Sequence, residues 1–205
     1  MGLRKSLFAA TYDRMSRGSE EAGLRALRQG LLANASGRVL EIGAGTGANL
    51  SLYNGTIDKL VITEPESAML RRLQKTAREH VPTADVLQAP AEQLPFADGS
   101  FDTVVSTLVL CGVGDPVQAV QEARRVLKPG GQLLFIEHVL SDDPGYARFQ
   151  HRMNWLNRFV VQCDCNRPTL ATIEAEGFTV SQLQRTELPK APKFVRPLIV
   201  GAASV

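Results

Sequence analysis

The residues best suited to bind a ligand are a run of glycines and two acidic residues that flank it in the sequence. Gly43, Gly45 and Gly47 directly follow the short apolar segment 38–42. Glycine lets the chain turn sharply where a strand ends, and it brings a ligand close to backbone N–H groups that a side chain would cover. The sequence therefore predicts a ligand that touches the main chain at this turn.

The two acids restrict the chemistry of that ligand. Glu41 lies inside the first expected strand, where its carboxylate can hold the glycine turn or reach an ammonium group, and where a diphosphate would be repelled. Glu64 lies 21 positions after Gly43, at the end of the next expected strand, where a carboxylate can accept both hydroxyls of a ribose. Together they favour a nucleoside that carries an amino-acid group.

The glycines alone leave a second class of enzyme open. Gly43, Gly45 and Ala48 also satisfy the spacing of a dinucleotide-binding turn. An NAD(P)-dependent oxidoreductase is therefore an alternative, although Glu41 opposes a diphosphate at this place. A third alternative is a module that binds the nucleoside without catalysis.

Alternating strands and helices must position these residues, and this order predicts a parallel sheet covered on both faces. A helix is expected directly after the glycine turn, and others at 65–77, 115–126 and 168–176. The segments 178–183 and 194–203 have no helix between them, so we expect an antiparallel hairpin at the sheet edge. Further strands are expected at 38–42, 59–63, 84–88, 101–107 and 132–137. The expected fold is a Rossmann-like, doubly wound α/β sheet of seven mostly parallel strands.

An N-terminal helical segment precedes this sheet. Ser19 is the expected N-cap, with Glu20 and Glu21 in the first turn. Leucines 24, 27, 31 and 32 then fall on one face, which should lie against the sheet or over the mouth of the site.

The composition excludes several classes of partner. The 23 Lys and Arg residues nearly balance 21 Asp and Glu residues, so no overall field favours nucleic acid. No run approaches the roughly 20 apolar residues that span a bilayer, which leaves only peripheral membrane contact open. The three cysteines, Cys111, Cys163 and Cys165, favour reduced thiols in a cytoplasmic protein. We expect no metal site, and the oligomeric state stays open.

Five segments, taken in order and spacing, resemble the class I S-adenosylmethionine-dependent methyltransferases. They are Val39–Gly47 (VLEIGAGTG), Glu64, Ala91-Glu92, Phe101-Asp102 and Arg125–Gly131 (RVLKPGG). The resemblance covers roughly residues 38–138 and implies S-adenosylmethionine as cofactor and S-adenosylhomocysteine as product. It implies cofactor contacts at Tyr12, Glu41, Gly43, Ala44, Gly45, Thr46, Gly47, Asn49, Glu64, Pro65, Met69, Ala91, Glu92, Thr107 and Leu108.

The sequence has no repeat, low-complexity tract or Gly/Ser linker, so we expect a single methyltransferase domain over residues 1–205. Its parts would be a helical preface (1–36), a cofactor-binding core (37–140), a substrate-side insertion (141–167) and a C-terminal helix and hairpin (168–205).

A narrower resemblance is to the methyltransferase-like thiol S-methyltransferases and their bacterial relatives. It is carried by Thr107–Cys111 (TLVLC), Glu137–Val139 (EHV), Cys163 with Arg167, and Arg196-Pro197. The sequence departs from that pattern in lacking an apolar anchor at its start and in having Gln162 where a glycine is expected. The expected acceptor is a small molecule, with a thiol favoured and a phospholipid amine or a quinone carbon as alternatives.

Transfer of a methyl group from a sulfonium mainly requires alignment of donor and acceptor and exclusion of water. His138, just after the fifth strand, is the first candidate for a base that activates the acceptor. The expected acceptor-binding residues are Cys111, His138, Trp155 and Arg167.

Overall fold

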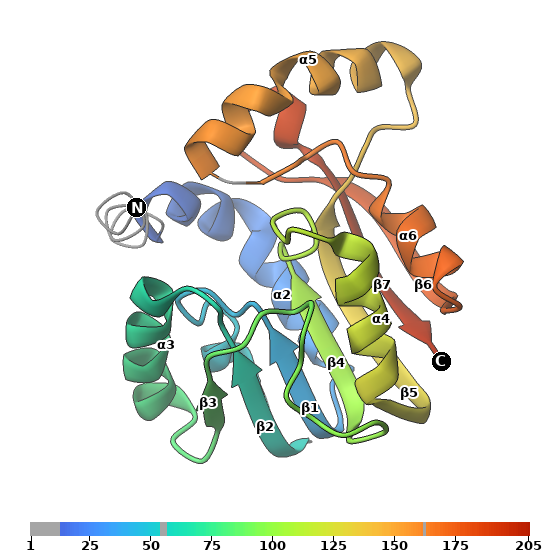
Figure 1. Cartoon of the computed structure of the whole chain (residues 1–205). Helices are drawn as coiled ribbons and strands as arrows, with labels where there is room; N and C mark the ends of the chain where they lie inside the picture. The colour runs from blue at the N-terminus through green and yellow to red at the C-terminus, as the bar shows by residue number, and fades with distance from the viewer. Residues whose placement is uncertain (1–12, 54–56, 162) are drawn as a thin grey trace.

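The computed structural model describes residues 13–53, 57–161 and 163–205. Within this part of the chain, seven strands form one sheet in the order β3-β2-β1-β4-β5-β7-β6 (Figure 1). The strands are β1 (Gly37–Ile42), β2 (Ile57–Thr63), β3 (Asp85–Leu87), β4 (Phe101–Thr107), β5 (Leu127–His138), β6 (Thr179–Glu187) and β7 (Pro197–Ser204).

The pairing of the strands confirms the expected fold class. Strands β1 to β5 pair in parallel, and β7 runs antiparallel to both β5 and β6. The central strands are buried on both faces, which is why they are rich in valine, isoleucine and leucine with little alternation.

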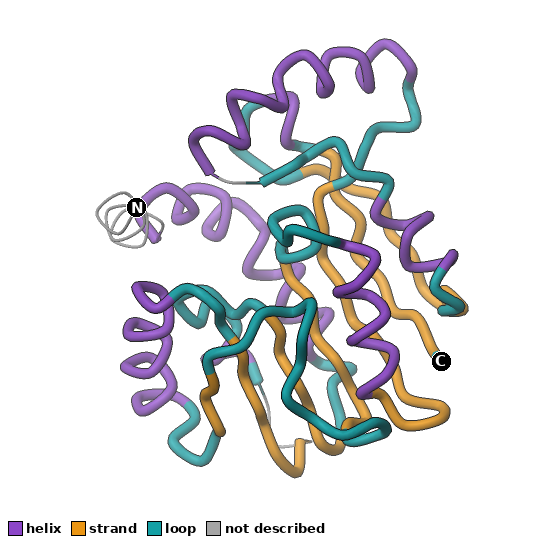
Figure 2. Tube along the Cα trace, in the orientation of Figure 1, coloured by secondary structure: helices purple, strands orange, loops and turns teal. Residues whose placement is uncertain are grey.

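Helices cover both faces of the sheet, as the purple segments of Figure 2 show. The α-helices are α2 (Arg25–Leu32), α3 (Ser67–His80), α4 (Pro116–Val126), α5 (Pro144–Val161) and α6 (Thr169–Ala175), and all but α5 lie on a face of the sheet. Helices α2 and α3 pack on one face, where Leu31 and Leu73 join Val105 and Ile136 in one apolar cluster. Helices α4 and α6 pack on the other face, where Val120 and Ile173 join a second cluster.

Helix α5 lies above the carboxyl ends of the strands in Figure 1. This is the edge of the sheet at which ligands bind in open α/β folds. In the described ranges, no helix is both long enough and apolar enough to cross a membrane.

The N-terminal segment follows the expected apolar pattern but not the expected start. Leu24, Leu31 and Leu32 are buried against the sheet, as predicted. Ser19 is not an N-cap: it has helical backbone angles, residues 13–18 before it are already helical, and its hydroxyl donates to the Pro189 carbonyl at 2.8 Å. A π-helical turn, η1 (Glu20–Leu24), then leads into α2.

The helix expected directly after the glycine turn is also absent from the described residues. Residues 45–49 form successive turns that end in a short 3-10 helix, η2 (Leu50–Leu52). Gly47 has a φ of +92°, which a right-handed helix cannot contain. Three left-handed glycines in five residues therefore lengthen the turn into a loop.

Candidate active site

The candidate site lies where the strand order reverses, between β1 and β4. The glycine loop follows β1, Glu64 follows β2, Thr107 ends β4 and His138 ends β5. Because parallel strands end at the same edge, residues far apart in the sequence meet there.

The glycine loop needs glycine for two different reasons. Gly43 has a φ of +56°, and a Cβ atom there would lie 2.6 Å from Val109 Cγ1, so glycine lets the Val109 side chain pack directly against the backbone of the loop. Gly45 has a φ of +60°, and a Cβ atom there would have no neighbour within 4 Å, so its backbone faces open space. Gly45 therefore presents a surface that a ligand can approach.

Glu64 holds this loop in place. Its Oε2 accepts a hydrogen bond from Gly45 N at 2.9 Å, and its Oε1 accepts one from Glu66 N at 2.8 Å. Burial raises the pKa of Glu64, and these two hydrogen bonds oppose the rise. The carboxylate is thus fixed beside the open face of the loop.

Glu41 is a buried carboxylate at the base of the same notch. It accepts hydrogen bonds from Asn49 Nδ2 at 2.9 Å and from the Tyr53 hydroxyl at 2.8 Å. Burial raises the pKa of Glu41 to about 7, while Tyr53, Asn49 and the nearby Arg28 limit the rise. A carboxyl group in this state gains from any cation that comes within reach.

Arg28 of α2 is a member of the site that the sequence reasoning missed. Only 4% of it is exposed, and its Nη1 donates to Asn49 Oδ1 at 3.0 Å and to Thr107 Oγ1 at 2.8 Å. Its Nε pairs with Glu20 at 3.0 Å. A signal existed, since Arg28 lies four positions after Leu24 and three before Leu31, on the buried face of the helix.

Seven of the expected cofactor residues line one notch of about 40 Å³, together with Arg28 and Ala48. They are Glu41, Gly43, Ala44, Gly45, Asn49, Thr107 and Leu108. The notch is narrow because Arg28, Asn49 and Thr107 bond to one another inside it. A ligand that enters must replace some of these bonds with its own.

Other expected cofactor residues lie around the notch or away from it. Pro65 follows Glu64 directly, and its carbonyl accepts from Gln88. Thr46 donates to Asp13 at 2.6 Å, and Gly47 packs against Leu50. Met69 and Ala91 are buried in the core. Tyr12 and Gln162 lie outside the described residues.

Glu92 bonds to backbone groups outside the notch, and its expected cofactor contact stays a prediction. Its Oε1 accepts hydrogen bonds from the backbone N–H groups of Gly114 at 2.8 Å and Asp115 at 3.4 Å, just before α4. A carboxylate is stabilised by the positive end of a helix, which explains this position. In this structure Glu92 fixes the loop that leads into α4 and does not line the notch.

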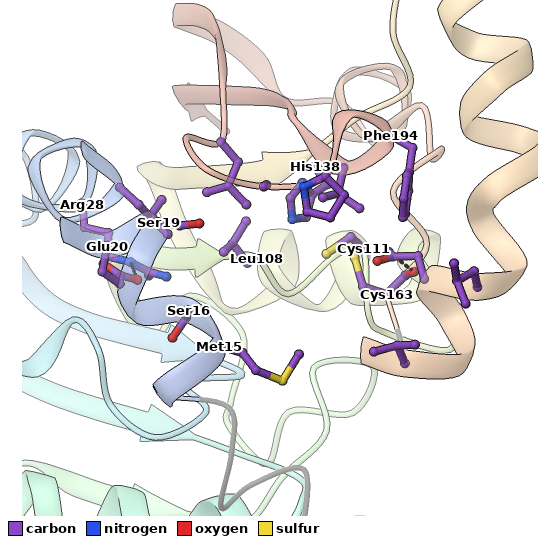
Figure 3. Close-up of a pocket in the computed structure, with 18 residues that line it drawn as sticks. Met15, Ser16, Ser19, Glu20, Arg28, Leu108, Cys111, His138, Cys163 and Phe194 are labelled. Atoms are coloured by element: carbon purple, nitrogen blue, oxygen red, sulfur yellow. Dashed lines mark hydrogen bonds and ion pairs between the residues drawn. The ribbon is translucent and has the colours of Figure 1, made fainter. Parts of the chain in front are cut away.

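A larger cavity of about 470 Å³ adjoins the notch, and Arg28 and Leu108 line both. Its wall is mainly apolar and includes Leu24, Leu156, Val160, Leu188 and Phe194 (Figure 3). The expected acceptor residues Cys111 and His138 also line it. The two hollows can therefore hold two ligands that meet at Leu108.

His138 has an unusual position in this wall. The residue is 7% exposed, and among the described residues its Nδ1 has no hydrogen-bond partner. Burial lowers the pKa of His138 to about 4, and backbone groups of Val195 and Pro197 partly oppose this. The imidazole is therefore neutral at pH 7, and Nδ1 has a free lone pair in the tautomer that carries the proton on Nε2.

The adjacent Glu137 shapes the border between the hollows. Its Oε1 accepts from the Ser106 hydroxyl at 2.7 Å and from Val109 N at 3.0 Å. Leu108, the residue before Val109, has a φ of +61°, which is uncommon for leucine. The buried carboxylate therefore holds the strained turn that places Leu108 between notch and cavity.

Two expected acceptor residues do not line the cavity. Trp155 is 68% exposed, because α5 turns Leu156 and Asn157 toward the cavity and neighbouring helical residues point about 100° apart. Arg167 donates to the carbonyls of Leu110 at 2.7 Å and Val113 at 2.8 Å and pairs with Asp164. It ties the loop after β4 to the segment after α5.

Comparison with known proteins agrees with this arrangement. Residues 40–135 match a family model described as a methyltransferase domain. The human thiol S-methyltransferase TMT1B is 36% identical over 84% of this chain and 73% of its own length. A phosphatidylethanolamine N-methyltransferase from Cereibacter sphaeroides is 30% identical over 67% of this chain and 72% of its own. A solved methyltransferase from Thermotoga maritima shares the fold, with a TM-score of 0.71 and 24% identity over 100% of this chain and 99% of that one.

Proposed function

This chain belongs to the S-adenosylmethionine-dependent methyltransferases, and on that premise we propose that it methylates a small apolar acceptor, with a thiol as the preferred class. The observation that carries the proposal is the pair of adjoining hollows. A polar notch that contains Arg28 and Glu41, with Glu64 beside it, meets an apolar cavity at Leu108.

The notch suits the cofactor by its charges. An amino-acid nucleoside needs a cation for its carboxylate, an anion for its ammonium and an acceptor for its ribose hydroxyls. Arg28 and Glu41 lie in the notch and Glu64 beside it, while Gly45 leaves the backbone open. We assign the carboxylate to Arg28, the ammonium to Glu41 and the ribose to Glu64.

The cavity suits an apolar acceptor. When bound, S-adenosylmethionine supplies an electrophilic methyl carbon on a sulfonium that becomes a neutral thioether as the methyl group leaves. The apolar wall keeps water from this carbon, which favours transfer to the aligned acceptor. The preface (1–36) and the insertion (141–167) both contribute to this wall, so we propose that they serve the acceptor and that the core (37–140) serves the cofactor.

His138 is the proposed proton acceptor. A thiol sulfur becomes far more acidic as it donates its electron pair to the methyl carbon, so even a base with a pKa of about 4 can take the proton. Nδ1 is itself buried, so the imidazole must turn toward the cavity for Nδ1 to accept a hydrogen bond from the S–H group before transfer. The proton then leaves the sulfur as the new S–C bond forms.

The polarity of the cavity favours a thiol over an amine. Among the described residues that line it, Glu20 is the one carboxylate, and it is paired with Arg28. A buried ammonium or hydroxyl needs several hydrogen bonds, whereas a thiol needs few. The likeness to TMT1B supports the same acceptor class.

Methyl-labelled S-adenosylmethionine, offered with matched alkyl thiols, amines, phenols and quinols, tests the proposal by mass spectrometry of the products. We expect labelled thioethers to form over many turnovers. Labelled amines without thioethers would overturn the acceptor class, and no heat of binding with S-adenosylmethionine or S-adenosylhomocysteine on folded protein would overturn the cofactor.

A further inference from the structure

Two segments far apart in the sequence bring Cys111 and Cys163 together at the cavity wall. Cys111 lies in the loop after β4, and Cys163 follows α5. The backbone N–H of Asp164, bonded to the carbonyl carbon of Cys163, donates to the carbonyl oxygen of Cys111 at 2.7 Å. Asn157 Nδ2 donates to the Cys163 carbonyl at 2.7 Å and fixes the same segment to α5.

The two thiols are themselves in contact. A hydrogen bond between the side chains of Cys163 and Cys111, together with burial, raises the pKa of the Cys111 thiol. Figure 3 shows both side chains beside His138 on one side of the cavity. Cys111 is buried, whereas Cys163 is partly exposed, so a molecule in the cavity can reach Cys163 first.

Cys165 provides a contrast within the same segment. It is fully buried, its backbone N–H donates to Asn154 Oδ1 at 3.1 Å, and it does not line the cavity. Cys165 is therefore placed as a packed core residue. Cys111 and Cys163 instead place two adjacent thiols where a small apolar molecule would bind.

We propose that Cys111 and Cys163 form a redox-active dithiol that reduces small apolar disulfides admitted to the cavity. The Cys163 thiolate attacks one sulfur of the disulfide, the S–S bond breaks, and one thiolate leaves and takes up a proton. Cys111, whose thiol gives its proton to the thiolate released in the first step, then attacks the Cys163 sulfur of the mixed disulfide, and the second thiolate leaves and is protonated. The dithiol loses two electrons and two protons, and the external disulfide gains both.

The geometry allows this second step without a large rearrangement. A disulfide requires two cysteine backbones within a short range of each other, and the Asp164-to-Cys111 hydrogen bond already joins the two backbones. Return to the dithiol state requires an external thiol reductant. Reduction of the disulfide does not depend on the proposed function. One consequence does rest on it: the thiol that is released would already lie in the cavity in which thiols are methylated.

The test uses the full chain, reduced and desalted, with 2,2′-dithiodipyridine as the apolar disulfide and oxidised glutathione as a charged disulfide of larger size. We expect two equivalents of thiopyridone per protein and a Cys111–Cys163 cross-link in the peptide map. Oxidised glutathione should react at least about tenfold more slowly than 2,2′-dithiodipyridine. Cys165→Ser, the matched control, should behave like the wild type.

The variants separate the two steps. Cys111→Ser should release one equivalent and keep a mixed disulfide on Cys163, and Cys111→Ala provides the same measurement if the serine variant does not fold. Cys163→Ser should slow the release at least about tenfold. A persistent mixed disulfide on wild-type protein, without the cross-link, would overturn the proposal. Because mass and thiol counts are read without any methyl transfer, failure of the methyltransferase assay would be a separate result.

Discussion

Arg28 Nη1 lies 2.8 Å from Thr107 Oγ1, so the N-terminal helix α2 is joined to the end of β4 by a partly buried, charged hydrogen bond. The same nitrogen donates to Asn49, whose amide in turn donates to Glu41. Arg28 therefore links the helical preface to the carboxylate at the base of the notch.

Arg28→Lys should weaken the binding of S-adenosylhomocysteine by roughly ten- to a hundredfold, because one ammonium cannot reproduce the fork of the guanidinium toward Asn49, Thr107 and a ligand carboxylate. Isothermal titration calorimetry measures the change. Arg25→Lys on the same helix is the matched control, since Arg25 is exposed and bonds to Ser51. Equal affinities for the two variants would show that Arg28 does not contact the cofactor.

Glu64→Gln should weaken cofactor binding about tenfold, because a neutral amide accepts ribose hydroxyls less strongly than a carboxylate does. The free energy of unfolding should fall by less than about 1.5 kcal/mol, because the amide oxygen can still accept one of the two loop hydrogen bonds. Titration calorimetry and urea unfolding measure the two effects. The exposed Glu79→Gln on α3 is the control, and a Glu64 variant with unchanged affinity would remove its assignment to the ribose.

Glu41 should make folding less favourable as the pH rises. Burial raises its folded-state pKa from 4.5 to about 7, so the folded state holds a proton that the unfolded state releases between these values. The stability contribution is complete below about pH 4.5, is lost as the pH rises toward 7, and then stays constant. His138, with its pKa lowered from 6.5 to about 4, has the opposite trend over nearly the same range.

The two trends partly cancel in the wild type, so the informative measurement is a difference. The free energy of unfolding of Glu41→Gln and of the wild type is measured in urea from pH 4.5 to 7.5. The difference between the two should shift in favour of the variant by about 1–3 kcal/mol as the pH rises. If the difference in free energy of unfolding does not change with pH, the pKa of Glu41 is the same in the folded and unfolded states.

The sequence was most informative where structure depends on neighbouring residues. The place of the glycine loop, Glu41 and Glu64 at the edge of the sheet could be predicted because apolar strand segments and glycine turns are encoded within a few positions, while their contacts with a cofactor stay predictions. The place of Arg28 in the site could not be predicted, because its partner Thr107 lies 79 positions away and is brought to it by the packing of whole elements. Trp155 was misplaced because aromatic content alone does not say which face of α5 turns toward the cavity.

His138→Ala should reduce kcat on a thiol acceptor by about a hundredfold and leave cofactor affinity unchanged, because His138 lines the acceptor cavity but not the notch. His138→Gln should recover part of the rate if its amide oxygen reaches the position of Nδ1, since it can accept the S–H bond without taking the proton. Stopped assays with methyl-labelled donor give kcat and KM, and calorimetry gives the affinity. His151→Ala, at an exposed position of α5, is the matched control.

In the wild type the rate should fall only as the pH approaches about 4, where the imidazole becomes protonated and Nδ1 loses its lone pair. If His138→Ala keeps the full rate on a confirmed acceptor, or if only its KM changes, the imidazole shapes the cavity and the proton leaves by another route.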